Sequence, residues 1–231
     1  VDAIGSKIRI FTKLTSPPSD TLITDLARLY AEGFNNKPWD VYQWKLSSEK
    51  ARKELNELVS IVLKTGGALI TIETCSSSGG LIVESECKAA GFCVVTDLGT
   101  MINRLSEVER FKRLPRNFRN PREYFKKLSK LTGIRQSEFE SVAYIADLVV
   151  DIGYRGRGFG KDLTKAGIEY SHAGGRLFAL TWTVNKAAVP IFLLLGFNFI
   201  TGIGDEGQGI DFLIQGKRWY PTLAFLPRKS T

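Results

Sequence analysis

The chain has 231 residues, of which 43% are hydrophobic and 24% are charged. This composition is typical of a folded globular protein and excludes the disordered, collagen-like and coiled-coil classes. The net charge is +8, and residues 104–135 alone hold 11 Lys and Arg against 3 Asp and Glu. This segment therefore carries the whole basic excess, which indicates an anionic partner there.

The sequence lacks the usual marks of a membrane or secreted protein. Its longest apolar run without a charge, about residues 187–197, is far shorter than the roughly 20 residues that span a bilayer. The N-terminal residues do not follow the pattern of a signal peptide. Cys75, Cys87 and Cys93 form no CxxC pair, and their odd number argues against a disulfide framework. We expect no membrane segment, no disulfide and a reducing, cytoplasmic location.

A single histidine, His172, restricts the possible chemistry. No metal-ligand spacing joins it to cysteines or carboxylates, so we expect no metal site. A Ser-His-Asp or Cys-His mechanism would depend on this one residue. Because it stands beside Gly174 and Gly175, near the predicted end of a helix, we interpret it as a helix-end cation.

The first half of the chain predicts one strand, two helices and then three β-rich stretches. Apolar residues alternate in the first strand, and Ser19 and Ser48 stand at helix starts. The second helix is expected to end at Gly66 and Gly67. The predicted elements are a strand at 7–15, helices after Ser19 and from Ser48, and β-rich stretches at 68–74, 80–86 and 88–97.

The second half predicts alternating strands and helices. A glycine-rich turn at 153–160 connects a strongly β-like run to a helix. The expected elements are strands at 141–150 and 177–184, helices at 159–171 and 187–195, and a closing pair of strands at 197–203 and 209–216. With no internal repeat or long linker, we expect one α/β domain over residues 1–231 with a basic helical insert at about 98–140.

The glycine-rich turn predicts a phosphate-binding site. A strand ends at Val150, a helix begins near Phe159, and the glycines between them let several backbone N–H groups approach one ligand. Arg155, Arg157 and Lys161 add positive charge. The spacing fits neither the G-x-G-x-x-G fingerprint of dinucleotide-binding proteins nor the P-loop.

Three stretches together resemble the GCN5-related N-acetyltransferases. Arg155, Gly158 and Gly160 match the family's [Q/R]-x-x-G-x-[G/A] motif. Asn185 to Phe197 resembles its N-x-x-A-x-x-x-Y-x-x-x-G-F signature, with Phe192 in place of the tyrosine. Upstream, residues 81–84 and 90–95 resemble the family's second and third strands.

The resemblance implies a fold and a cofactor site. The fold is a mixed central sheet with splayed fourth and fifth strands and helices on both faces, and the co-substrate is acetyl-CoA or another acyl-CoA. In such a protein Asn185 hydrogen-bonds the pantetheine arm, while Ala188 and Phe192 line the cofactor channel. Leu148, Val149 and Val150 offer free backbone groups to the pantetheine. The pyrophosphate is held by Arg155, Gly156, Arg157, Gly158, Phe159, Gly160 and Lys161.

The catalytic residues are less clearly marked. Phe192 cannot donate the proton that the family's tyrosine gives to the departing thiolate, although a thiolate can leave without much help; Tyr144 or Tyr154 is a possible substitute. Asp147 stands in an apolar strand beside the expected thioester, so we predict that it is the general base. The alternative is a structural aspartate at a strand bulge, with Glu138 and Glu140 as other candidate bases.

The predicted function is acetyl transfer from acetyl-CoA to a primary amine, by direct attack in a ternary complex. The acceptor is a small molecule or a protein amine. One alternative is a catalytically weak or inactive acyl-CoA-binding module, which Phe192 favours. Another is a nucleic-acid-associated protein that uses the basic insert. Two other interpretations of the insert are a solvated helical lid and a segment that helps to bind the 3′-phosphate of CoA.

Overall fold

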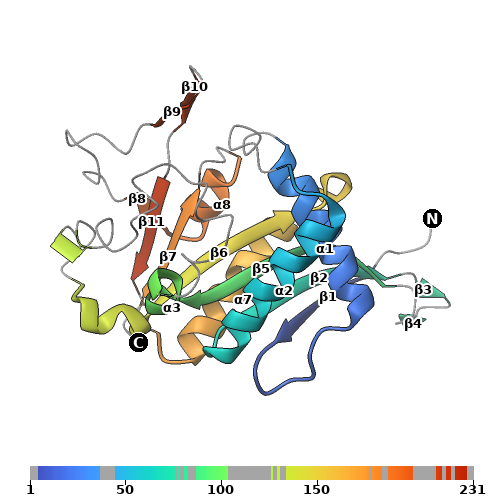
Figure 1. Ribbon diagram of the computed structural model, residues 1–231, viewed down its shortest axis with the longest axis horizontal. Helices are drawn as coiled ribbons and strands as arrows, with labels where there is room; N and C mark the ends of the chain where they lie inside the picture. Colours follow the sequence, from blue (N-terminus) through green and yellow to red (C-terminus); the bar gives the residue numbers. More distant parts are fainter. Residues whose placement is uncertain are drawn as a thin grey trace.

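A mixed β-sheet lies at the centre of the structure (Figure 1). The computed structural model describes residues 5–36, 45–75, 77–78, 81–82, 87–103, 126, 129–130, 134–176, 178–183, 187–199, 212–214, 217–219 and 222–227. Asn185 and most of the basic insert lie outside these residues, so the structure does not test the predictions made for them.

The sheet contains seven strands within the described residues. All neighbouring strands are antiparallel except β6 and β7, which are parallel, and this confirms the predicted mixed sheet. In spatial order the strands are β1 (Gly5–Phe11), β2 (Ala68–Cys75), β5 (Lys88–Asp97), β6 (Val142–Val150), β7 (Phe178–Thr183), β11 (Thr222–Pro227) and β8 (Asn198–Phe199).

Three long helices cover the two faces of this sheet. Helix α1 (Asp20–Asn35) begins where Ser19 accepts a hydrogen bond from the Leu22 N–H, as predicted. Helices α2 (Ser48–Lys64) and α7 (Phe159–Ala173) also lie where their apolar patterns predict them. The shorter helices are α3 (Leu98–Asn103), α8 (Val189–Leu194) and the 3₁₀ turns η4 (Gln136–Ser141) and η5 (Ile152–Tyr154).

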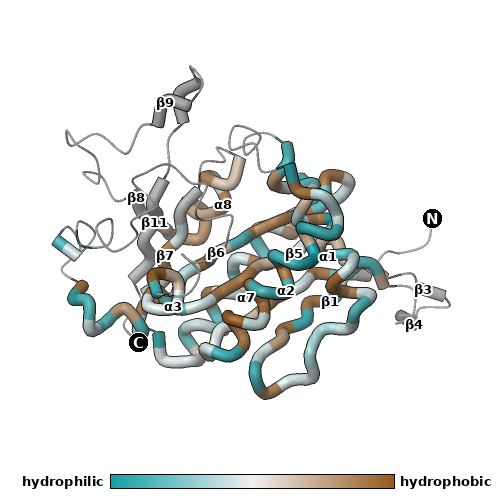
Figure 2. Tube along the Cα trace, viewed as in Figure 1, coloured by the Kyte–Doolittle hydropathy of each residue, from teal (hydrophilic) through white to brown (hydrophobic). Residues whose placement is uncertain are grey.

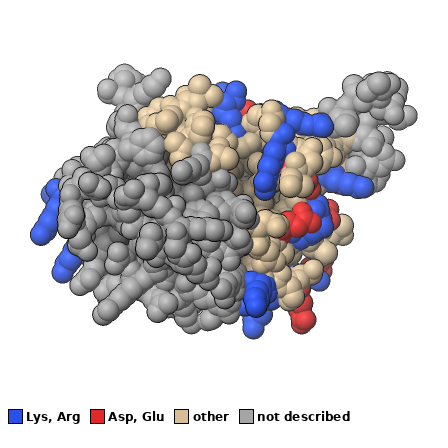
Figure 3. All heavy atoms as spheres, turned by 90° about the horizontal axis from the view of Figure 1, so that it is seen from above, with Lys and Arg blue, Asp and Glu red and all other residues tan. Residues whose placement is uncertain are grey.

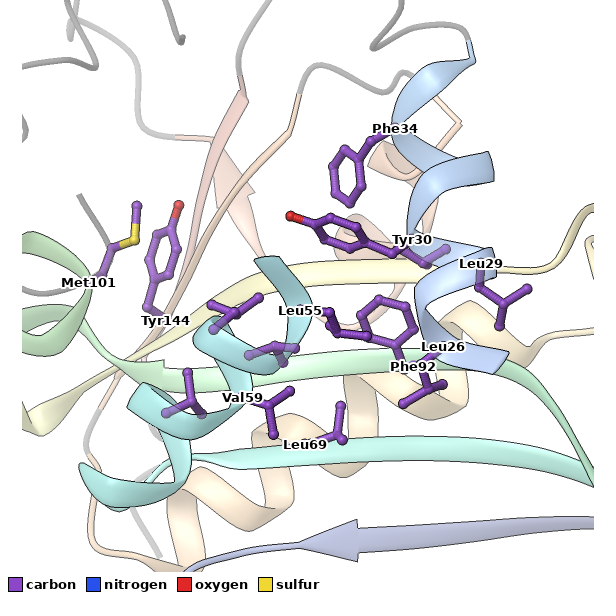
Figure 4. Close-up of a cluster of buried hydrophobic side chains, with 14 of the residues drawn as sticks. Leu26, Leu29, Tyr30, Phe34, Leu55, Val59, Leu69, Phe92, Met101 and Tyr144 are labelled. Carbon is purple, nitrogen blue, oxygen red and sulfur yellow. The ribbon is translucent and has the colours of Figure 1, made fainter. Parts of the chain in front are cut away.

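Each face of the sheet has its own hydrophobic core. Side chains of α1 and α2 pack on one face around Tyr30, Leu55 and Phe92 (Figure 4). Side chains of α7 pack on the other face with Ile70 and Cys93. In Figure 2 the central strands are mostly coloured as hydrophobic, whereas α1 and α2 contain both hydrophobic and hydrophilic residues. Burial on both faces explains why β2 and β5 read as nearly continuous apolar runs.

Strands β6 and β7 separate along their length, as the resemblance implied. They pair only from Val142 to Ile145 on β6 and from Phe178 to Thr181 on β7. From residue 146 to residue 150, β6 has no β7 partner among the described residues. The backbone of Leu148 to Val150 therefore has one edge that no described strand occupies and that an extended ligand could join. Within this segment the Val150 carbonyl accepts a hydrogen bond from Arg155 Nε at 3.2 Å.

The prediction that the cysteines form no disulfide is wrong. Cys75, the last residue of β2, is bonded to Cys87, which stands just before β5. Spacing along the chain gives no sign of this pair, because the bond depends on β2 and β5 being antiparallel neighbours. The cytoplasmic location rested on the cysteines and stays an untested prediction. Among the helices of the described residues, none has the length and hydropathy needed to cross a membrane.

Two strand assignments also need correction. The second strand of the sheet is β2, whereas Leu81 and Ile82 form β4 in a small hairpin with β3 (Ser77–Ser78). The stretches at 197–203 and 209–216 were expected to pair with each other, but the parts of them that the structure describes pair elsewhere. Strand β8 pairs with β11, and β9 (Phe212–Ile214) pairs with β10 (Lys217–Trp219). The sequence reading missed β11, the neighbour of β7.

Candidate functional site

A cleft of about 530 Å³ opens beside the free end of β6. Its walls come from the C-terminal end of α1, the last residues of β6, the glycine-rich turn and the start of α8. The lining residues are Gly33, Phe34, Leu148, Val149, Val150, Tyr154, Arg155, Gly156, Gly158, Phe159, Gly160, Lys161, Ala187, Ala188 and Ile191.

Backbone contacts fix the start of the turn. The Asp151 N–H donates to the Ala90 carbonyl at 2.9 Å, and the Asp151 carboxylate accepts a hydrogen bond from the Gly153 N–H at 2.8 Å. Arg28 of α1 donates to the same carboxylate at 3.2 Å. Burial lowers the pKa of Arg28, but its hydrogen bonds to Glu32 and Asp151 outweigh that effect, so the net pKa is raised and Arg28 stays charged.

The second half of the turn requires glycine. Gly158 has φ +88° and is the N-cap of α7, a conformation that L-residues rarely adopt. At Gly160 a β-carbon would lie 2.9 Å from Ile191 Cδ1, so the two helices approach closely there. No side chain caps the start of α7. The first N–H groups of this helix are therefore available to an anion.

These features fit the pyrophosphate of an acyl-CoA. The uncapped helix start offers donors, the helix dipole favours negative charge, and Arg155 and Lys161 line the same cleft. The free edge of β6 is suited to an extended, amide-containing chain such as pantetheine. In the described part of the chain, no group of three or more His, Cys, Asp or Glu side chains could hold a metal ion.

An aromatic group supports the turn from the sheet side. The Tyr154 ring stacks on Phe159, with centroids 5.9 Å apart, and the Arg157 guanidinium lies 5.3 Å from the Tyr154 centroid. The hydroxyl groups of Tyr154 and Thr74 are hydrogen-bonded at 3.1 Å. Tyr154 thus joins the turn to the end of β2.

The structure brings most of the predicted cofactor residues together. Arg157 is not among the residues that line the cleft. Phe192 does not line it either, because its buried ring packs against Phe197 with centroids 5.3 Å apart. Asn185 lies outside the described residues. The predicted residues that do line the cleft are Leu148, Val149, Val150, Arg155, Gly156, Gly158, Phe159, Gly160, Lys161 and Ala188; their roles stay predictions.

Asp147 lies at a bulge in β6. Val94 of β5 pairs with Asp147 but Val95 pairs with Ile145, so Ala146 is the extra residue. Val94 belongs to the core under α1 and α2, and the register places Asp147 on that face. The residue is 5% exposed. Its position combines the bulge of the structural interpretation with the burial expected of a general base.

The two other candidate bases differ from Asp147. Glu138 is exposed, and the hydrogen bond from Arg135 lowers the pKa of its carboxyl. A carboxylate held in its charged form is a weak proton acceptor. Glu140 lines a separate cavity of about 420 Å³ with Asp97, Asn103 and Arg176. Neither glutamate lines the cleft beside β6.

The sequence reading missed the wall that α1 contributes. Gly33 and Phe34 line the cleft, and a β-carbon on Gly33 would lie 3.0 Å from Val149 Cγ1. The Phe34 ring packs against Tyr30 with centroids 4.9 Å apart (Figure 4). The signal available in the sequence was an isolated glycine within an amphipathic helix, which indicates close packing.

A larger side chain at position 33 is expected to weaken cofactor binding. We expect Gly33→Leu to raise the KM for acetyl-CoA about tenfold, because its side chain would fill the cleft wall or push α1 away from Val149. Gly33→Ala, the matched control, adds one carbon and favours the helix, so its KM should change at most about twofold. Equal KM values for the Leu variant and the unchanged protein would contradict this placement of α1.

Comparison with known families agrees with this geometry. The sequence model of the Acetyltransferase (GNAT) family matches residues 32–197, a span that includes the cleft and more than half of the chain. The chain belongs to the GNAT family. Family membership supports acetyltransferase activity with an acyl-CoA co-substrate. A search of curated protein sequences finds no match.

Solved GNAT-fold structures cover nearly the whole chain. A Salmonella typhimurium protein solved with its cofactor acetyl-CoA superposes with TM-score 0.54 and 12% identity, over 98% of this chain and 96% of its own. Arylalkylamine N-acetyltransferase 2 of Aedes aegypti superposes with TM-score 0.56 and 16% identity, over 95% of this chain and 98% of its own. Ribosomal-protein-alanine N-acetyltransferase of Brucella melitensis superposes with TM-score 0.54 and 13% identity, over 96% of this chain and 99% of its own. At these identities the likeness shows the fold.

Proposed function

We propose that this GNAT protein transfers the acetyl group of acetyl-CoA to a primary amine. The observation that carries the proposal is the cleft that joins the free edge of β6 to the uncapped start of α7. One wall suits an extended amide chain and the other suits a pyrophosphate. The two walls meet at a single opening, so one elongated ligand can use both.

Within this site the chain's residues bind, orient and take up a proton. The turn neutralises the phosphates, and Leu148 to Val150 align the arm so that the acyl group lies near the bulge. Bound acetyl-CoA supplies an activated thioester for attack by the amine. Asp147 takes a proton from the acceptor's ammonium group, directly or through water, so that the neutral amine attacks the thioester carbon; the C–S bond then breaks and the thiolate leaves to be protonated by water. Its burial favours this role, because desolvation favours the neutral form of a carboxyl.

Direct attack by the amine is favoured over a cysteine-bound acyl intermediate. Cys75 and Cys87 are joined in a disulfide, and Cys93 is fully buried between β5 and α7. Burial raises the pKa of the Cys93 thiol, and the nearby Asp147 charge raises it further, so this thiol stays protonated. In this disulfide-bonded form, none of the three cysteines is an available nucleophile.

Replacing Cys93 should therefore leave the chemistry intact. We expect Cys93→Ala to keep its kcat within about twofold, and native Cys93 to resist alkylation at pH 8 while the unfolded chain reacts. Mass spectrometry after brief alkylation checks the second point. A loss of turnover greater than tenfold in a folded Cys93→Ala protein would argue against direct attack.

The test of the proposed function is a calorimetric titration with acetyl-CoA, followed by a screen of primary amines. Saturable binding together with CoA release in the presence of an amine supports transfer. Absence of binding by the folded chain overturns the proposal. Binding without turnover for any amine would favour an acyl-CoA-binding module. Phe192 supports that second candidate, because it cannot protonate the leaving thiolate.

The acceptor is proposed only by class, as a small-molecule or protein amine. Residues 104–125 of the basic insert lie outside the described residues, so the anionic partner expected there stays a prediction. On the face drawn in Figure 3, acidic and basic side chains of the described residues lie close together. Arg28, Glu32 and Asp151 form a cluster of ion pairs beside the turn.

A further inference from the structure

The disulfide lies next to the residues that hold the cofactor turn. Cys75 follows Thr74, whose hydroxyl is hydrogen-bonded to the Tyr154 hydroxyl at 3.1 Å. Tyr154 lines the cleft and stacks on Phe159, the first residue of α7. One hydrogen bond therefore separates the residue adjacent to the disulfide from the wall of the acyl-CoA site.

The same ends of β2 and β5 pair only weakly with each other apart from the disulfide, whereas β2 stays paired with β1 up to its last residue, Cys75 with Gly5. Ile72 pairs with Gly91, but Glu73 pairs with Ala89, so Ala90 is an extra residue in β5. Beyond this bulge the two strands make only two more residue pairs, Glu73 with Ala89 and Thr74 with Lys88. Short strand ends open readily unless they are tied down. The Cys75–Cys87 bond closes this end.

The turn is attached to the sheet through this segment. The extra residue, Ala90, accepts the hydrogen bond from the Asp151 N–H that begins the turn. Thr74 holds Tyr154 at the other side of the turn. The first contact continues the β5–β6 ladder beyond Gly91 and Val150, whereas the second belongs to β2, in which Thr74 is paired with Ser6 of β1. Separation of the β2 and β5 ends would therefore move Thr74, together with β1, away from the turn that β5 and β6 hold.

We propose that the Cys75–Cys87 pair is a thiol–disulfide modification site whose redox state sets the affinity for acyl-CoA. The inference rests on the proposed function and adds a form of regulation to the same cleft. The oxidised protein keeps Thr74 against Tyr154 and binds tightly. In the reduced protein the end of β2, still paired with β1, separates from β5, so that Thr74 leaves Tyr154 and binding is weaker.

The reductant is a dithiol, and its attack is directed to one sulfur. Cys87 is partly exposed, whereas Cys75 is 1% exposed. A dithiol thiolate attacks Cys87 Sγ and breaks the Sγ–Sγ bond, which forms a mixed disulfide and releases the Cys75 thiolate. That thiolate takes up a proton. The second thiolate of the reductant then attacks its own bound sulfur, giving an oxidised cyclic disulfide and the Cys87 thiol. Two electrons and two protons pass to the protein.

The experiment compares acetyl-CoA binding by the oxidised and dithiol-reduced chain. Thiol counts after unfolding should be one before reduction and three after it, because the chain has three cysteines. We expect the Kd to rise about fivefold to tenfold on reduction, the size expected for one lost hydrogen bond, while far-UV circular dichroism stays unchanged. An equal Kd in both states overturns the inference, and so does complete unfolding on reduction.

Thr74→Val tests the connecting contact without touching the disulfide or the cleft wall. The valine keeps the shape of threonine but removes the hydroxyl. We expect the oxidised variant to bind as the reduced unchanged protein does, and its Kd to be nearly independent of redox state. A variant that retains the full redox effect would overturn the inference. If the oxidised unchanged chain binds no acetyl-CoA at all, the proposed function fails instead.

Discussion

We expect the affinity for acetyl-CoA to fall at least about a hundredfold when Arg155→Glu is combined with Gly158→Asp. Gly158 has φ +88°, so any side chain there strains the turn. The two new carboxylates also place negative charge beside the donors expected to hold the pyrophosphate. Removing one charged partner and adding repulsion costs about 3 kcal/mol or more, which corresponds to about two orders of magnitude in Kd. Calorimetric titration measures the effect.

The other end of α7 offers a matched control. Lys165→Glu combined with Gly175→Asp makes the same change in net charge, and Gly175 has a similar φ of +82° with nothing near its β-carbon position. Lys165 is largely exposed, in an ion pair with Glu169. Neither residue lines the cleft. The Kd of this control for acetyl-CoA should lie within about twofold of that of the unchanged protein. If both variants lost the same affinity, the turn would not be part of the cofactor site.

We expect Asp147→Asn to lower kcat by about a hundredfold to a thousandfold and to leave the Kd for acetyl-CoA nearly unchanged. Asparagine keeps the size and most hydrogen bonds of aspartate but cannot take a proton, and general base catalysis contributes about 10²–10⁴-fold. The residue is buried at the bulge of β6, outside the lining of the cofactor cleft. Steady-state kinetics with an accepted amine, beside calorimetry, separates the two effects.

Glu138→Gln and Glu140→Gln are the controls for this variant. Both residues lie away from the cleft, and Glu138 is already held in its charged form by Arg135. We expect each control to keep kcat within about twofold. If Asp147→Asn turned over at the normal rate, or lost its fold, Asp147 would be a structural residue of the bulge.

The sequence predicted the local parts of this site correctly. A strand, a glycine-rich turn and a helix start follow one another within residues 142–173, and their signals are propensity and φ requirements within a few residues. The uncapped helix start follows from Gly158, since glycine has no side chain to cap it. This stretch carried one part of the resemblance to the GNAT family, beside Asn185 to Phe197 and the strands at 81–84 and 90–95.

Other parts of the site depend on segments far apart in the sequence. Gly33 and Phe34 line the cleft because α1 crosses β6, more than a hundred residues later in the chain. Phe192 was expected to line the channel, yet it packs on Phe197, as the turn after α8 brings the two rings together. Single-segment patterns carry no information about such contacts.

The sequence by itself determined the α/β class, the caps of α1 and the glycine turn, because hydrophobic period, capping and backbone conformation are set by neighbouring residues. Only the tertiary structure decided that Cys75 meets Cys87, that β11 lies beside β7, and that the bulge puts Asp147 under α1 and α2. Each of these depends on which strands become neighbours and in which register. That choice is made by burial over the whole sheet, so no short stretch of sequence records it.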